Sequence, residues 1–201
     1  MAAERHIDKS RLTFFTDALL AIIMTILVLD IKVPEGLEGL NGEECFKNIM
    51  HVFPHLVGFL ISFAFIVVLW FSHHDLMESL HYANRPLARL NFCFIATTAT
   101  LPFSTALAAA YPAQSYAVAT LALNMFFMNI FLAGLHMYAI VTGLRDMNYF
   151  PARYLRIKQW LGMIGGFVFL AALFVAFLNP HIALVMIAAV PLMHVMPIPN
   201  E

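Results

Sequence analysis

Long apolar stretches dominate this chain, and each is about as long as a helix that crosses a bilayer. Of its 201 residues, 62% are hydrophobic and 11% are charged, whereas about a quarter are charged in ordinary soluble domains. A crossing helix needs about 20 mostly apolar residues, since each residue advances it by about 1.5 Å. The mean hydropathy of +0.82 fits this reading. We therefore expect an all-α membrane protein, and the net charge of -1 gives no indication of a nucleic-acid partner.

Hydropathy predicts six transmembrane helices in a single domain, residues 1–201. Proline, glycine and an Asn-Pro pair separate the stretches, as expected for turns, and the sixth stretch is the shortest. The tail Pro197–Glu201 is expected to be disordered. The predicted spans are Phe14–Val33, Val52–Phe71, Leu87–Ala108, Tyr116–Val141, Lys158–Leu178 and His181–Met196.

The positive charges predict the orientation of these spans. Nine of the 11 Lys and Arg residues precede the first span or lie in the second and fourth connections. Because cytoplasmic segments carry the excess of positive charge, both termini are expected in the cytoplasm of a multi-pass protein. The nine are Arg5, Lys9, Arg11, Arg85, Arg89, Arg145, Arg153, Arg156 and Lys158. The opposite side has only Lys32 and Lys47, alongside several glutamates.

The first span opens with an arginine and an aspartate six residues apart, Arg11 and Asp17. Ionisable side chains near lipid are costly and are usually functional. On a helical wheel of about 100° per residue, Ile22, Ile26 and Leu29 form one narrow stripe, and Asp17 lies about 220° from Ile22. Asp17 is therefore expected to face the protein interior, where it needs a partner. Partners on neighbouring helices fit better than Arg11, which lies about 120° away on the same helix.

The stripe alone leaves the function open. An Ile/Leu stripe on a membrane helix more often packs against other helices or lipid than lines a pore. Thr25 lies beside it, and a threonine in such a helix usually bonds to its own backbone.

Three motifs, in order, resemble the transmembrane protein 175 family of potassium channels. Residues 11–17, RLTFFTD, are similar to the family signature RxxxFSD, with a threonine that keeps the serine hydroxyl. Residues 70–74, WFSHH, resemble its tryptophan and histidine pair. Asn91 and residues 101–105, LPFST, resemble its asparagine and proline-phenylalanine turn. The resemblance covers about residues 11–105; beyond them it rests on the number of spans.

The resemblance implies a homotetramer in the plasma membrane of a prokaryote, with the first helix of each subunit lining a central pore. It assigns the pore constriction to Ile22, Ile26 and Leu29, and a contribution to potassium preference to Thr25. It implies no cofactor, with potassium as the permeant ion and membrane lipid and identical subunits as partners. It also implies an interhelical polar network of Arg11, Phe15, Thr16, Asp17, Trp70, His73 and Asn91.

The chain has no TVGYG-like segment, so the carbonyl cage of ordinary potassium channels is absent. A ring of four isoleucines can expel water, and slight dilation would admit a partly dehydrated ion. Potassium holds its hydration shell less tightly than sodium, so we expect modest potassium selectivity, with Thr25 hydroxyls replacing some of the lost water. Whether the ring is a gate, a filter or both stays open.

Two other classes of function compete with a channel. A secondary transporter would show inverted repeats and broken helices near the midplane; we see no internal repeat and no break in the first span. A metalloenzyme would use the histidines, but His51 and His55 are far along the helix from His73, and no HExxH or nucleophile motif occurs. An enzyme is therefore not expected.

Several other residues have plainer expected roles. Asp75 and Glu78 begin a predicted cytoplasmic connection and are expected to be solvated. Gly162, Gly165 and Gly166 are expected to let the fifth span approach a neighbour closely.

Overall fold

The computed structural model describes residues 7–34, 38–39 and 41–195, and eight helices occupy most of this part of the chain. The tail Pro197–Glu201, which was predicted to be disordered, lies outside the described ranges. Met196, the last residue of the sixth predicted span, also lies outside them. The helices are α1 (Lys9–Leu29), α2 (Gly42–Met50), α3 (Phe53–Glu78), α4 (Arg85–Ala99), α5 (Leu101–Ala110), α6 (Ser115–Val141), α7 (Ala152–Val175) and α8 (Pro180–Val195).

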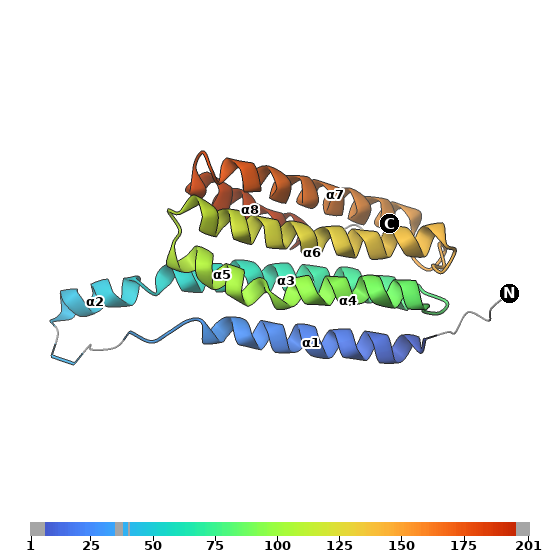
Figure 1. Cartoon of the computed structure of the whole chain (residues 1–201), viewed down its shortest axis with the longest axis horizontal. Coiled ribbons are helices and arrows are strands. Elements are labelled where there is room, and N and C mark those ends of the chain that lie inside the picture. The colour runs from blue at the N-terminus through green and yellow to red at the C-terminus, as the bar shows by residue number, and fades with distance from the viewer. Residues whose placement is uncertain (1–6, 35–37, 40, 196–201) are drawn as a thin grey trace.

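The helices form an elongated bundle in which α1 lies along one edge (Figure 1). It packs against α3 and α4 and, to a lesser extent, α5. On the other side of those helices, α6 packs against α4 and α5 and also against α7 and α8. The bundle's own helices therefore cover α1 on one face only.

Five helical stretches are long and apolar enough to cross a membrane, and they overlap the first five predicted spans. The sixth stretch, α8, has 16 residues. At about 1.5 Å per residue, it is shorter than a hydrocarbon core of about 30 Å. The five stretches are Lys9–Leu29, Gly42–Glu78, Arg85–Ala110, Ser115–Val141 and Ala152–Val175.

The first helix begins and ends earlier than predicted. Asp8 caps it: its carboxylate accepts a hydrogen bond from the Ser10 backbone N–H at 2.9 Å, which satisfies one free donor of the first turn. The helix ends at Leu29, so Lys32 and Val33 lie outside it. Val33 precedes Pro34, and a residue in that position is disfavoured in helical conformation.

Helix α2 was not predicted, because its segment reads as a polar connection. A capping box stabilises its first turn. The Asn41 side chain accepts a hydrogen bond from the Glu44 N–H at 3.0 Å, and the Glu44 carboxylate accepts one from the Asn41 N–H at 3.3 Å. The sequence Asn-x-x-Glu was the readable signal. This helix projects beyond the rest of the bundle, and its end of the molecule is called the α2 end (Figure 1).

The third predicted span is divided in two by Thr100, between α4 and α5. Pro102 follows in the first turn of α5; it has no N–H to donate, and its ring crowds the carbonyl of Thr98 four residues earlier. A continuous apolar pattern concealed this break, although the proline marked its position.

At the end opposite α2, three separate segments are joined by backbone contacts. Ile7 pairs with Ala83, and Leu80 pairs with Arg145. The Lys9 ammonium also donates to the Leu80 carbonyl at 2.8 Å, just beyond the end of α3. The start of α1, the α3–α4 connection and the α6–α7 connection thus meet at this end, which we call the amino-terminal end.

Positive charge is concentrated at the amino-terminal end. Of the Lys and Arg residues that the structure describes, only Lys32 and Lys47 belong to the α2 end. The basic residues predicted to gather in alternate connections therefore lie together at one end of the bundle, and few lie at the other end.

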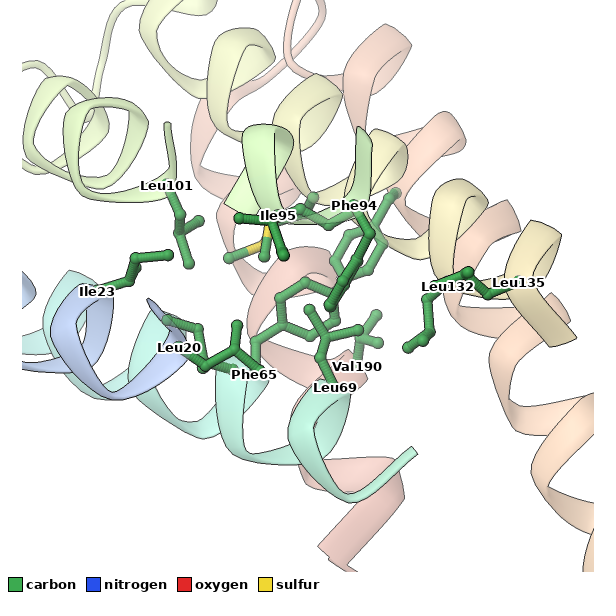
Figure 2. Close-up of a cluster of buried hydrophobic side chains, with 14 of the residues drawn as sticks. Leu20, Ile23, Phe65, Leu69, Phe94, Ile95, Leu101, Leu132, Leu135 and Val190 are labelled. Atoms are coloured by element: carbon green, nitrogen blue, oxygen red, sulfur yellow. The ribbon is translucent and has the colours of Figure 1, made fainter. Parts of the chain in front are cut away.

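The core consists of apolar side chains from all the long helices. Figure 2 shows Leu20 and Ile23 of α1 directed toward side chains of the middle helices, including Phe65, Ile95 and Leu101. Further along the core, the Phe65 and Phe169 rings meet edge to face, with centroids 5.0 Å apart.

Two of the three glycines noted in the fifth span provide a close helix contact. A Cβ added at Gly166 would lie 2.8 Å from Oδ1 of Asn129 on α6, and one added at Gly165 would lie 3.1 Å from Val190 on α8. A Cβ at Gly162 would meet nothing within 4 Å. Gly165 and Gly166 thus allow the predicted close approach of the fifth span to its neighbours, whereas Gly162 does not contribute to it.

Gly166→Ala should lower the stability of the protein, whereas Gly162→Ala should not. Overpacking costs about 1–3 kcal/mol, which exceeds the gain of up to about 1 kcal/mol from replacing a helical glycine. Gly162→Ala meets no neighbouring atom within 4 Å, so only the stabilisation from replacing a helical glycine applies. The melting temperatures of the two variants in detergent test this, and a Gly166→Ala variant that melts at or above the wild-type temperature would show that the contact is not tight.

Candidate functional site

The predicted pore stripe lies on the uncovered face of α1. Ile22, Ile26 and Leu29 are 51%, 41% and 73% exposed, whereas the intervening Ile23 and Leu27 are 4% and 1% exposed. The two sets differ although both are aliphatic, so packing against α3, α4 and α5 selects which side of α1 is buried. A single chain therefore presents an apolar stripe that none of its own helices covers.

Thr25 lies on the same exposed face. Its hydroxyl donates to the Ile22 carbonyl at 2.7 Å, the local bond that threonines commonly form in membrane helices. Because the single hydroxyl hydrogen is used in this bond, the oxygen lone pairs are what Thr25 offers to its surroundings.

Asp17 has a partner on the neighbouring helix α3, as expected. The indole N–H of Trp70 donates to Oδ1 of Asp17 at 3.0 Å. The Trp70 ring is also stacked on His74, with centroids 5.2 Å apart. This bond joins α1 to α3 on the opposite side of α1 from the exposed stripe.

Asn91 of α4 is the centre of a second connection, to α1 and α3 together. Thr16 donates to the Leu12 carbonyl at 2.9 Å, so its oxygen accepts from the Asn91 amide N–H at 2.7 Å. The Asn91 carbonyl oxygen is then left to accept from Nε2–H of His73 at 2.8 Å. Thr16, His73 and Asn91 are each 0% exposed. Leaving one such buried group unpaired costs about 1–3 kcal/mol, so the chain of bonds fixes three helices against one another.

Arg11 and Phe15 lie outside this network in the single chain. Arg11 is exposed and forms no side-chain hydrogen bond or ion pair with any residue in the described ranges. Phe15 is 46% exposed and meets the Phe92 ring of α4 edge to face, with centroids 5.8 Å apart. The structure thus brings together Thr16, Asp17, Trp70, His73 and Asn91 and leaves the other two signature residues at the surface.

Asp75 is not solvated, contrary to expectation. It is 8% exposed, because α3 continues past the predicted end of the second span and keeps Asp75 against α7. There its carboxylate accepts from the Tyr154 hydroxyl at 2.8 Å and forms an ion pair with Lys158. The available signal was an acidic residue shortly after the predicted second span and a basic residue, Lys158, at the start of the fifth. Glu78, one turn further, is partly exposed and pairs with His74 at 3.3 Å.

His136 joins α6 to α3 beside this ion pair, and sequence reasoning did not single it out. The Arg145 guanidinium donates to Nδ1 of His136 at 3.1 Å, and the opposite ring nitrogen bonds to the Ser72 hydroxyl at 3.2 Å. The pKa of Arg145 is lower than its ordinary value, because burial disfavours the charged guanidinium more than the nearby Asp75 carboxylate favours it. Because a guanidinium can only donate, His136 accepts at Nδ1 and carries its hydrogen on Nε2.

The histidines at the α2 end do not form a metal site within the described part of the chain. His51 and His55 line a cavity of about 590 Å³ with Asp30 and Lys32. No group of three or more His, Cys, Asp or Glu side chains among the described residues is placed to hold a metal ion.

Comparisons with known proteins agree with the motifs. Residues 11–102 match the model of the family described as endosomal/lysosomal potassium channel TMEM175. A potassium channel of Streptomyces collinus is 30% identical over 165 residues, which are 79% of this chain and 79% of that protein. A potassium channel of a Chryseobacterium species is 30% identical over 97 residues, 48% of this chain and 47% of that protein. The match to that second relative therefore spans about half of its length.

The fold also has a solved counterpart. The crystal structure of a lysosomal potassium-selective channel TMEM175 homolog from Chamaesiphon minutus superposes with a TM-score of 0.77 at 21% identity. The superposition covers 92% of this chain and 95% of that chain. With the extended match to the Streptomyces protein and the motifs placed on α1, α3 and α4, the chain is a multi-pass membrane protein that belongs to the TMEM175 family.

Proposed function

We propose that this protein is a potassium channel in which α1 of four identical subunits surrounds the pore. The main support for this proposal is that the other helices cover only one face of α1. The exposed face presents Ile22, Thr25, Ile26 and Leu29. The naming of relatives as potassium channels supports the choice of ion. Ala18 and Ala21, also exposed on α1, would let neighbouring copies approach closely.

In this arrangement the constriction is a series of apolar rings. Ile22, Ile26 and Leu29 recur about once per helical turn, so four copies would place three rings along the axis, about 6 Å and about 4.5 Å apart. Rings of this kind close a pore by expelling water without blocking it completely with side chains. A small outward shift of α1 would then admit a partly dehydrated cation.

Thr25 would supply the only side-chain oxygens between the first two rings. Its hydroxyl hydrogen is already donated to the backbone, so four hydroxyl oxygens would present lone pairs to a passing cation. This replaces a small part of the hydration shell, which fits a modest preference for potassium over sodium.

The positive-inside rule places the amino-terminal end, and with it both termini, in the cytoplasm. We accordingly assign the chain, residues 1–201, as one six-helix channel subunit in the plasma membrane of a prokaryote. Its partners would be permeant potassium, membrane lipid and three identical subunits; we assign it no cofactor and no catalytic role.

A secondary transporter is the alternative that one observation favours. The break between α4 and α5 at Thr100 resembles the discontinuous helices that form ion sites in transporters. Flux through the reconstituted protein distinguishes the two. A channel gives unitary currents that grow with voltage, whereas a transporter gives saturating flux coupled to a counter-ion.

Ile22→Ala should raise unitary conductance and weaken discrimination between potassium and sodium, because it widens the first ring. Single-channel recording in planar bilayers, with potassium on one side and sodium on the other, measures both quantities. Ile130→Ala is the matched control, since Ile130 is 45% exposed on α6, away from α1. Wild-type currents from Ile22→Ala would remove Ile22 from the constriction.

Thr25→Val should lower the potassium-to-sodium permeability ratio while conserving side-chain volume. Reversal potentials under bi-ionic conditions provide the ratio. Thr120→Val is the matched control, because Thr120 on α6 donates to its own backbone in the same way, to Tyr116 at 2.8 Å. A ratio equal to that of the control would exclude Thr25 from selectivity.

Asp17→Ala should impair assembly of the tetramer and leave ion preference unchanged in any channels that form. Removing the acceptor leaves the Trp70 N–H unpaired, at a cost of about 1–3 kcal/mol, and frees α1 to rotate. Light scattering on purified protein reports the oligomer, and Asp17→Asn, which retains an acceptor oxygen, should largely restore it. A stable Asp17→Ala tetramer with altered selectivity would instead place Asp17 at the ion pathway.

A further inference from the structure

Near the α2 end, the bundle contains a cavity of about 210 Å³ that is separate from the candidate pore face of α1. Helices α3, α5, α6 and α8 contribute to its walls. Its main lining residues are Val57, Ile61, Thr105, Ala109, Leu184 and Ile187. For comparison, an apolar cavity of about 150 Å³ in another protein stays dry and binds benzene or xenon.

The chemistry of the walls excludes a polar occupant. Thr105 is the one lining residue with a polar side chain, and its hydroxyl is hydrogen-bonded to the buried Ser62 hydroxyl at 2.7 Å. Its methyl group is turned toward Gly58 instead: a Cβ added at Gly58 would lie 3.3 Å from Cγ2 of Thr105. A water molecule needs two to four polar partners to reside in a cavity, and these walls do not supply them.

The cavity is also continuous with an exposed apolar surface. Phe53 lines it and is 57% exposed. The neighbouring Leu56 of α3 and Val185 of α8 are 41% and 70% exposed. Because α3 belongs to a stretch long and apolar enough to cross a membrane, we infer that this exposed apolar surface faces lipid.

We propose that this cavity holds part of the acyl chain of a phospholipid from the leaflet at the α2 end. The acyl chain would enter past Phe53 and occupy the space between α3, α5, α6 and α8. An inserted chain would supply the van der Waals contacts that the walls of an empty cavity lack.

Photolabelling of the purified full-length protein tests this. A phosphatidylcholine with a diazirine in mid-chain is incorporated with the protein into nanodiscs, and labelled residues are mapped by peptide mass spectrometry. We expect labelling of Val57, Ile61 and Ile187 above that of Phe167, a 73% exposed residue on α7 that reports ordinary lipid contact. Labelling spread evenly over the exposed residues, or absent from the cavity, would overturn the proposal.

Val57→Phe should fill the cavity and reduce labelling of the other lining residues to the level at Phe167. Val185→Phe is the matched control, because it makes the same change on the exposed surface of α8; it should leave the labelling intact. Ala109→Leu fills the cavity from α5 if Val57→Phe does not purify like the wild type. Wild-type labelling in a folded filled variant would contradict the proposal, as would labelling by a diazirine fatty acid but not by the phospholipid.

Discussion

The rotation of α1 about its own axis depends on a few hydrogen bonds near its start. Helices in lipid gain no hydrophobic free energy by associating with one another, so packing and direct polar contacts determine their arrangement. Asn91 bonds to Thr16 and Trp70 bonds to Asp17, and together they fix which side of α1 faces α3 and α4. The uncovered side, with Ile22, Thr25 and Ile26, follows from this choice. The exposure of the apolar stripe is thus a consequence of polar contacts about one to three turns away.

The sequence was most informative where a single periodicity decided the outcome. The helical wheel placed Asp17 opposite the isoleucine stripe, and the structure agrees: Asp17 bonds to Trp70 on the side of α1 where Leu20, Ile23 and Leu27 are buried. The long apolar runs likewise identified the five candidate crossing helices, since a helix satisfies its backbone hydrogen bonds within one segment.

Sequence reasoning failed where a local signal competed with hydropathy. The capping box of α2 was obscured by a polar composition, and the break at Thr100 by an apolar one. The burial of Asp75 could not be foreseen from α3 alone, because its partners Tyr154 and Lys158 come from a helix more than seventy residues away. Arg11 and Phe15 are exposed in the single chain, so the polar network predicted to include them is not formed within one subunit's own helices.

The distribution of polar contacts along α1 has a mechanical consequence. Lys9, Thr16 and Asp17 attach the first half of the helix to α3 and α4. In the second half, beyond Leu20, the described residues offer apolar contacts and no interhelical hydrogen bond. A displacement of the second half breaks no interhelical hydrogen bond, whereas a displacement of the first half leaves buried polar groups unpaired at about 1–3 kcal/mol each. If α1 tilts, it therefore pivots near Asp17. The displacement of its backbone then increases along the helix and is largest at Leu29.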